Sequence, residues 1–144
     1  MLVRDAMPRH VITISMDATL SVGLQVFEAA AFHHLIVTED GAVVGVLSDR
    51  DLLENLSPFI GKLSEQTRDI ARLNRKVHQV MSRHLRTVTA DTPLANAGQM
   101  MIRDRIGCLP VVGDGGKVEG ILSIRDVARV TVDILKDSGL GEAA

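Results

Sequence analysis

The hydrophobic and polar positions of the chain follow the same succession of periods twice. Each copy opens with a short β-branched run, at residues 11–14 and 86–89, which predicts a strand. Apolar residues then recur at helical spacing, tightly in the first copy and more loosely in the second. These residues are Leu20, Leu24, Phe27 and Ala31, and Leu94, Ala97, Met101 and Ile106. A strand followed by a helix is therefore predicted at the start of each copy.

The second part of each copy predicts a hairpin and a further helix. In the first copy, apolar runs at 35–37 and 43–47 flank Glu39-Asp40-Gly41, which is a turn signal. In the second copy the runs at 109–112 and 118–122 flank a stretch rich in glycine. A helix beginning at Ser48 or Ser123 then closes each copy. The predicted order is β-α-β-β-α, twice, which is an α+β fold.

Direct comparison of the chain with itself shows that the two copies are an internal sequence repeat. They match at an offset of about 74 residues, which grows by one near Gly116, and two copies indicate a pseudo-twofold pair rather than a solenoid. Identical pairs include Val3 with Val77, Met7 with Met81, Leu35 with Leu109, Ser48 with Ser123, and Asp51 with Asp126. We place the repeats at residues 1–56 and 77–136, with an insert at 57–76 and a tail at 137–144.

The insert is expected to form a helix of its own. Pro58 and Gly61 should end the preceding helix, and Ser64 is a suitable N-cap for the next one. An apolar stripe then falls on one helical face, at Leu63, Ile70, Leu73, Val77 and Val80. The stripe fits either a linker helix packed on the domain or a helix that docks a partner protein.

Composition excludes several classes of function. The 144 residues are 46% apolar and 24% charged, which predicts a packed globular core. The net charge of -2 offers no footprint for a phosphate backbone, and three Phe without Trp or Tyr provide no platform for stacking successive bases, so no nucleic-acid partner is expected. Without an apolar leader, a membrane-spanning run or a second cysteine besides Cys108, we expect a cytoplasmic protein with no membrane insertion.

Enzymatic motifs are not apparent. The glycines at 113–120 join two strands and lack the phosphate-loop order, and no G-x-S-x-G surrounds Ser48 or Ser123. His33 and His34 are adjacent and would point to opposite faces of a strand, which does not suit joint metal ligation. Cys108 enters an apolar strand and is predicted to be a buried, inert thiol. We therefore predict no catalytic residues, no metal, no catalytic cofactor and no enzymatic activity.

Two polar motifs lie at the predicted strand-to-helix junctions. Ser48 with Asp51, and Ser123 with Asp126, have the spacing S-x-x-D. This spacing approximates a capping box, which stabilises a helix start by about 1 kcal/mol. The same junction also exposes unpaired N–H groups that favour an anion such as phosphate. Capping and ligand binding are compatible, so both interpretations stay open.

The repeat motifs resemble a known family. GVLSDRDLL at 45–53 and GILSIRDVA at 120–128, together with VRDAM at 3–7, VHQVM at 77–81 and LPVV at 109–112, are similar to a tandem pair of CBS domains, also called a Bateman module. The resemblance covers nearly all residues except the insert and the tail. It implies two repeats that pack through their sheets, with pseudo-twofold symmetry. It also implies two related clefts that bind adenosine-containing ligands such as AMP, ADP, ATP or S-adenosylmethionine.

The same resemblance implies roles for particular residues. Asp51 and Asp126 match the family's ribose ligands. The phosphate candidates are Ser48, Arg50, Ser123, Arg125, His33 and His34. Residues expected near the base or ribose are Thr13, Ile14, Ile36, Thr87, Val88 and Pro110.

The two repeats differ at these positions. The first has His33, His34 and Ile36 where the second has Gly107, Cys108 and Pro110. Histidine can supply a pH-sensitive positive charge near a phosphate, whereas Asp49 would oppose a phosphate if it faced the same cleft. We expect one cleft to bind better than the other, without a choice between them at this point.

The predicted function is a stand-alone regulatory module. It binds an adenine nucleotide as a regulatory ligand, with the need for Mg²⁺ left open, and transmits a change of shape or assembly to an unknown effector protein. The resemblance and the base rate for small domains both imply a homodimer. The alternative is a ligand-free dimerisation or interaction scaffold that docks a partner protein and uses the S-x-x-D residues only as caps.

Overall fold

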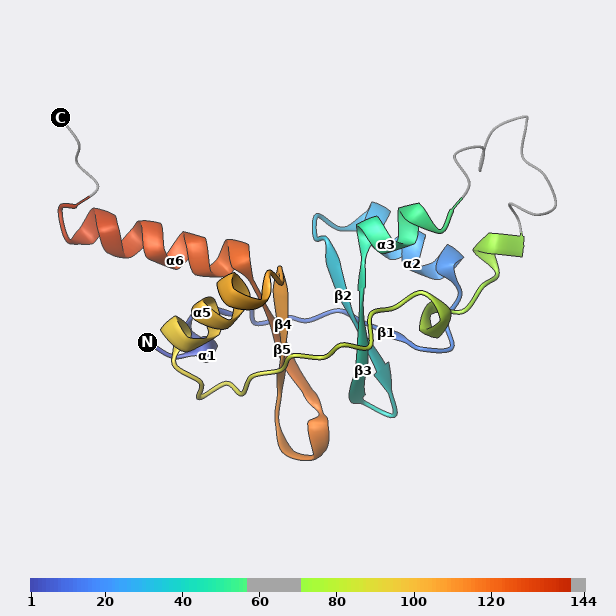
Figure 1. The fold of residues 1–144 in the computed structure, drawn as a ribbon, viewed down its shortest axis with the longest axis horizontal. Coiled ribbons are helices and arrows are strands. Elements are labelled where there is room, and N and C mark those ends of the chain that lie inside the picture. Colours follow the sequence, from blue (N-terminus) through green and yellow to red (C-terminus); the bar gives the residue numbers. More distant parts are fainter. Residues whose placement is uncertain (57–70, 141–144) are drawn as a thin grey trace. The chain divides into compact units, whose positions relative to one another are not determined.

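A computed structural model describes residues 1–56 and 71–140 of the chain. It divides the chain into two compact units, shown in Figure 1. Unit 1 contains Met1–Val11 and Arg86–Ala144, and unit 2 contains Ile12–Leu85. Each unit has its own hydrophobic cluster and its own sheet. The α+β class predicted from the periods is confirmed.

Unit 2 holds the elements of the first repeat that follow residue 11, together with the opening turn of the second repeat. Its sheet has the order β1-β2-β3, in which β1 is parallel to β2 and β2 is antiparallel to β3. The elements are β1 (Thr13–Ser15), α2 (Leu20–Ala29), β2 (His34–Glu39), β3 (Ala42–Ser48), α3 (Asp49–Glu54) and the 3₁₀ turn η1 (Val77–Gln79). Leu35, Val37 and Leu47 face the helices from one side of the sheet and form the centre of its core. Predicted and observed orders agree for this repeat.

The turn between β2 and β3 explains why the repeats shift by one residue. Asp40 and Gly41 both adopt left-handed conformations, with φ of 51° and 81°, as a two-residue hairpin turn requires. The second hairpin instead closes through the short 3₁₀ turn η2 (Asp114–Gly116), with Gly115 and Gly116 left-handed. The longer connection accommodates the extra residue near Gly116.

Unit 1 holds the elements of the second repeat that follow residue 85, together with the opening helix of the first repeat. They are α1 (Val3–Ala6), α5 (Leu94–Asp104), β4 (Cys108–Val112), η2, β5 (Val118–Ser123) and α6 (Ile124–Asp137). The predicted strand at 86–89 is reduced to a single parallel bridge between Val88 and Val111. Pro110 stands where the first repeat has Ile36, and proline has no N–H to extend a parallel ladder. The prediction of a full strand here is wrong for that reason.

The opening segments of the two repeats are exchanged between the units. Val3 and Ala6 of α1 belong to the core of unit 1, with Leu109 and Leu122. Val77 and Met81 belong to the core of unit 2. A repeat search cannot reveal this exchange, because each opening segment matches both copies equally well.

Backbone hydrogen bonds show that the exchange is the same on both sides. Val3 N–H donates to Thr92 and Arg4 N–H to Ala90, at 2.9 and 3.1 Å. At the equivalent positions, Val77 N–H donates to Ala18 and His78 N–H to Met16, at 2.8 and 3.1 Å. The pseudo-twofold relation between the repeats is therefore also present in their backbone hydrogen bonds.

The insert departs from the predicted continuous helix. Ser64, Leu63 and Ile70 lie outside the described residues, as do Pro58 and Gly61. Residues 71–73 are helical, but Lys76 is extended and pairs with Thr19. A helix through Val77 and Val80 is wrong, because the N–H groups of Val77 and His78 bond to unit 2 backbone instead of the preceding turn. Within the two described ranges, no helix is long and apolar enough to cross a membrane.

Candidate functional site

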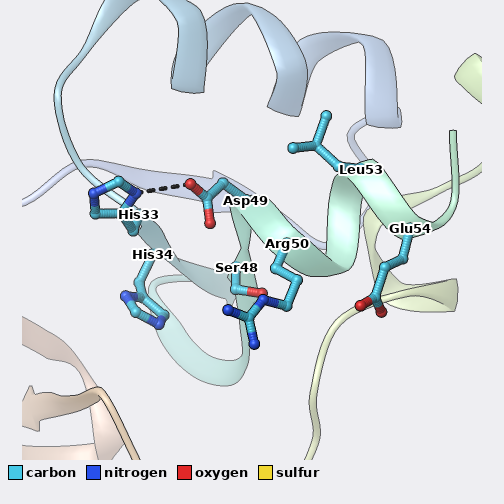
Figure 2. Close-up of a pocket in the computed structure, with 7 residues that line it drawn as sticks. All are labelled: His33, His34, Ser48, Asp49, Arg50, Leu53 and Glu54. Atoms are coloured by element: carbon cyan, nitrogen blue, oxygen red, sulfur yellow. Dashed lines mark hydrogen bonds and ion pairs between the residues drawn. The ribbon is translucent and has the colours of Figure 1, made fainter. Parts of the chain in front are cut away.

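A cleft in unit 2 brings together residues from the start of β2 and from α3. Its volume is about 790 Å³. His33 and His34 lie at the entry to β2, and Ser48 ends β3. The full lining is His33, His34, Ser48, Asp49, Arg50, Leu53 and Glu54, drawn in Figure 2. Four predicted phosphate candidates, Ser48, Arg50, His33 and His34, therefore share one concave surface.

His33 and Asp49 form an ion pair on this surface. The Nδ1 atom of His33 lies 2.7 Å from Oδ2 of Asp49, and the Asp49 N–H donates to the His33 carbonyl at 2.9 Å. The hydrogen bond from His33 is the main reason why the pKa of Asp49 lies below its ordinary value. His33 precedes β2, so strand alternation does not separate it from His34, and both rings line the cleft. The expectation of opposite faces applied to a pair within one strand, and His33 lies outside β2.

His34 lies in a different environment from His33. It is half-buried, and this burial lowers the pKa of its ring below the ordinary value. The charges of Asp49 and Asp51 act in the opposite direction and favour its protonated form. Asp51 is not among the residues that line the cleft, but its charge thus acts on one of them.

The two S-x-x-D motifs have different hydrogen bonds. In unit 1, the Asp126 N–H donates to Ser123 Oγ at 3.1 Å, and Oδ2 of Asp126 accepts from the N–H and Oγ of Ser123 at 2.8 and 2.6 Å. This is a complete capping box. In unit 2, the Asp51 N–H donates to Ser48 Oγ at 2.9 Å, but within residues 1–56 and 71–140 no hydrogen bond reaches the Asp51 carboxylate. Of the two motifs, the one in unit 1, Ser123 with Asp126, forms the complete capping box.

The other candidates are dispersed over the sheets. Thr13 and Thr87 are exposed, whereas Ile14 and Val88 are in the cores of their units, so only their backbones remain for a ligand. Ile36 and Pro110 are buried, and Ile36 belongs to neither hydrophobic cluster. Arg125 is exposed on the first turn of α6.

Sequence reasoning missed Leu53 and Glu54 as cleft residues. The available signal was helical spacing, because Asp49, Arg50, Leu53 and Glu54 share one face of a helix that starts after Ser48. Asp49 lines the same cleft as the two histidines. This is the arrangement in which its charge was expected to oppose a phosphate.

Cys108 is buried, as predicted, and burial raises the pKa of its thiol to about 12. A thiol with this pKa stays protonated near neutral pH and is a poor nucleophile. Across the described part of the chain, no group of three or more His, Cys, Asp or Glu side chains is arranged to hold a metal ion.

Comparison with known proteins decides the family. The model of the CBS domain matches twice, at residues 3–58 and 77–133. The chain belongs to the CBS domain family. A CBS domain-containing protein of Dictyostelium discoideum is 31% identical over 137 residues, which cover 94% of each chain. The chain spans about half of a 17.7 kDa protein of Acidianus ambivalens, at 30% identity over 54% of its length. It spans 24% of a homoserine O-acetyltransferase of Methanococcoides burtonii, at 29% identity.

Solved structures of CBS domain pairs have the same fold. A Vibrio cholerae protein assigned to acetoin utilization, AcuB, has a TM-score of 0.79 and 24% identity, with 99% of this chain and 98% of that chain covered. The CBS domain pair of protein MJ0100, in complex with 5′-methylthioadenosine and S-adenosyl-L-methionine, has a TM-score of 0.74 and 21% identity. The match covers 91% of this chain and 95% of that one. At these identities the likeness shows the fold.

Proposed function

We propose that the chain is a non-catalytic regulatory module that binds an adenosine-containing nucleotide in the cleft of unit 2. The observation that carries this proposal is the convergence of His33, His34, Ser48 and Arg50 on one concave surface. Its volume of about 790 Å³ lies within the range of small-molecule sites. The ligands of the MJ0100 domain pair both contain adenosine, which supports the same class here.

In this proposal, different polar groups bind different parts of the ligand. Arg50 and the histidines take the phosphates, because they are the lining residues that carry or can gain positive charge. Asp51 follows the lining residue Arg50 on α3 and accepts hydrogen bonds from the ribose hydroxyls at the edge of the cleft, since its carboxylate has no other hydrogen bond among the described residues. The carboxylate of Asp126 already accepts hydrogen bonds from Ser123 in its capping box. We therefore propose that the first repeat provides the better of the two sites.

The direct test is calorimetric titration of the full chain with AMP, ADP, ATP and S-adenosylmethionine, each with and without Mg²⁺. We expect one ligand to bind with a dissociation constant in the micromolar range and a stoichiometry of one per chain. A preference among AMP, ADP and ATP would define an energy sensor. No heat from any ligand at millimolar concentration would contradict the proposal and favour the scaffold alternative.

A specific observation also favours self-association, through the outer face of α6. Ile124, Val132 and Leu135 are 44%, 48% and 40% exposed, and residues 131–140 are all exposed. Figure 1 shows the C-terminal half of α6 continuing past α5. An apolar stripe on the solvent side of a helix is typical of an interface. We propose that a second copy of the chain covers it.

The order of side chains along this face suits an antiparallel pairing of two copies. Ile124, Ala128, Thr131 and Leu135 are alternately four and three residues apart, as in a two-helix seam. Their sizes are symmetric about the middle of the helix, so Ile124 can oppose Leu135 of the partner subunit, and the small residues can meet at the centre. The hydroxyl of Thr131 donates to the Val127 carbonyl at 2.8 Å, which leaves its methyl group for the contact.

Replacing both Ile124 and Leu135 by aspartate is expected to convert a dimer into a monomer, because four carboxylates would meet across the twofold axis. Light scattering after size-exclusion chromatography should give about twice 15.6 kDa for the wild type and 15.6 kDa for the variant. Val22→Asp on α2, where the side chain is 42% exposed, is the control and should stay dimeric. A monomeric wild type, or an unchanged mass in the double variant, would contradict this interface.

A further inference from the structure

The ion pair between His33 and Asp49 lies in the cleft of unit 2. Its two members are joined twice, by the side-chain contact of 2.7 Å and by the backbone bond from Asp49 N–H to the His33 carbonyl. Both side chains are open to solvent, with 60% and 37% of their surfaces exposed. Figure 2 shows the pair at one end of the cleft, with the ring of His34 beside it. An incoming anion therefore meets all three side chains.

The permanent charges of the cleft do not by themselves favour an anion. Arg50 is positive, whereas Asp49 and Glu54 are negative, and Asp51 acts on His34 from the adjoining turn of α3. On α2, which packs against α3, the charged residue is Glu28. With neutral histidines, the carboxylates outnumber the single guanidinium. With protonated histidines, His33 neutralises Asp49, and His34 adds a positive charge.

The state of His34 decides whether binding takes up a proton. Its burial favours the neutral ring in the unliganded protein, and the pKa of His34 is accordingly lowered. A phosphate beside the ring would favour the protonated form, because an opposite charge at short distance raises the pKa of an imidazole. Anion binding and proton uptake are then linked, and each strengthens the other.

Unit 1 has no counterpart of this arrangement. The residues at the positions of His33, His34 and Asp49 are Gly107, Cys108 and Ile124. The Cys108 thiol is buried, and glycine and isoleucine do not titrate. Any pH response of this kind is therefore a property of the first repeat.

We propose that His33, His34 and Asp49 make the unit 2 cleft a proton-coupled site, which accepts a phosphate-bearing nucleotide together with a proton and rejects it when the histidines are neutral. In this arrangement Asp49 is the residue that opposes anions, and His33 is the residue that cancels its charge. This inference rests on the proposed nucleotide function and adds its regulation by pH.

The test compares ATP with adenosine, which has no phosphate, by calorimetry on the full chain at pH 6.0 and pH 8.0. For the wild type we expect ATP to bind about five- to tenfold more tightly at pH 6.0, with proton uptake seen in buffers of different ionisation enthalpy. Adenosine should bind equally at both values. The titration of ATP's own phosphates is common to all variants, so the double variant His33→Gln with His34→Gln isolates the contribution of the histidines. It should reduce the ratio of ATP affinity at pH 6.0 to that at pH 8.0 at least threefold.

Single variants separate the two members of the pair. Asp49→Asn should strengthen ATP binding severalfold at pH 8.0, because the opposing charge is removed without loss of shape. His33→Gln should weaken ATP binding at pH 6.0, and adding Asp49→Asn to it should restore the affinity. His84→Ala is the control, since His84 is an exposed histidine of the same unit that does not line the cleft. Circular dichroism verifies that every variant is folded.

If the ratio of ATP affinity at pH 6.0 to that at pH 8.0 is equal for the wild type and the double histidine variant, this inference is overturned and nucleotide binding stands. Weaker ATP binding by Asp49→Asn at pH 8.0 would overturn the role given to Asp49. If neither ATP nor adenosine binds at either pH, the proposed function fails, and this inference fails with it.

Discussion

Replacing Asp51 by alanine is expected to weaken nucleotide binding by roughly ten- to a hundredfold while leaving the fold intact. The loss corresponds to a charge-assisted hydrogen bond of roughly 1.5–3 kcal/mol. Among the described residues, the structure gives the Asp51 carboxylate no hydrogen bond, so its removal breaks no observed side-chain contact of the helix start. Ser48 Oγ still accepts from the backbone N–H of residue 51. Calorimetry for affinity and urea unfolding for stability measure the two effects separately.

The matched control is Asp126→Ala, which should have the opposite pattern. Its Oδ2 accepts two hydrogen bonds from Ser123, and this capping box starts the long helix α6. Removing it should lower the free energy of unfolding by about 1 kcal/mol and change nucleotide affinity less than twofold. If Asp126→Ala abolishes binding and Asp51→Ala does not, the proposed site is in the wrong repeat.

Gly45→Ala is expected to lower the free energy of unfolding by roughly 2 kcal/mol or more, as overpacking of a core commonly does. A Cβ atom at Gly45 would lie 2.5 Å from Sδ of Met81 and 2.9 Å from the carbonyl oxygen of Ser82. That carbonyl cannot withdraw easily, because Ser82 and Val46 exchange two backbone hydrogen bonds, at 2.9 and 3.1 Å. Urea unfolding followed by circular dichroism measures the loss.

The equivalent glycine of the other repeat provides the comparison. A Cβ atom at Gly120 would meet only the side chain of Met7, with Sδ at 2.8 Å and Cε at 3.5 Å. A methionine side chain can move into another rotamer, so Gly120→Ala should cost less than about 1 kcal/mol. Equal losses for the two variants would show that the Ser82 carbonyl is not the limiting contact.

Local signals in the sequence were sufficient for much of the fold. Asp40 and Gly41 indicated the first hairpin turn, and Ser48 and Ser123 were identified as helix starts, because turns and caps depend on residues close in the chain. The strand expected at 86–89 failed because its pairing depends on Pro110, which is distant in sequence and lacks an N–H.

The candidate site shows the same division between local and distant information. The spacing of Ser48 and Asp51 is visible in the sequence, but the position of Asp49 opposite His33 depends on how β2 meets α3. The difference between Asp51 and Asp126 was also hidden, since both motifs have identical spacing and only the side-chain orientation distinguishes them. The family resemblance proposed the same role for both aspartates, and the structure shows that their hydrogen bonds differ.

The exchanged opening segments have a consequence for the order of events during synthesis. Unit 2 consists of residues 12–85, so all of its chain is synthesised before residues 86 onward of unit 1. Residues 1–11 are synthesised before unit 2, yet they group with residues 86 onward. Val3 and Ala6 must therefore wait, unprotected, until the strands bearing Leu109 and Leu122 are translated. A segment that is synthesised before all of unit 2 is thus buried only after unit 2 is complete.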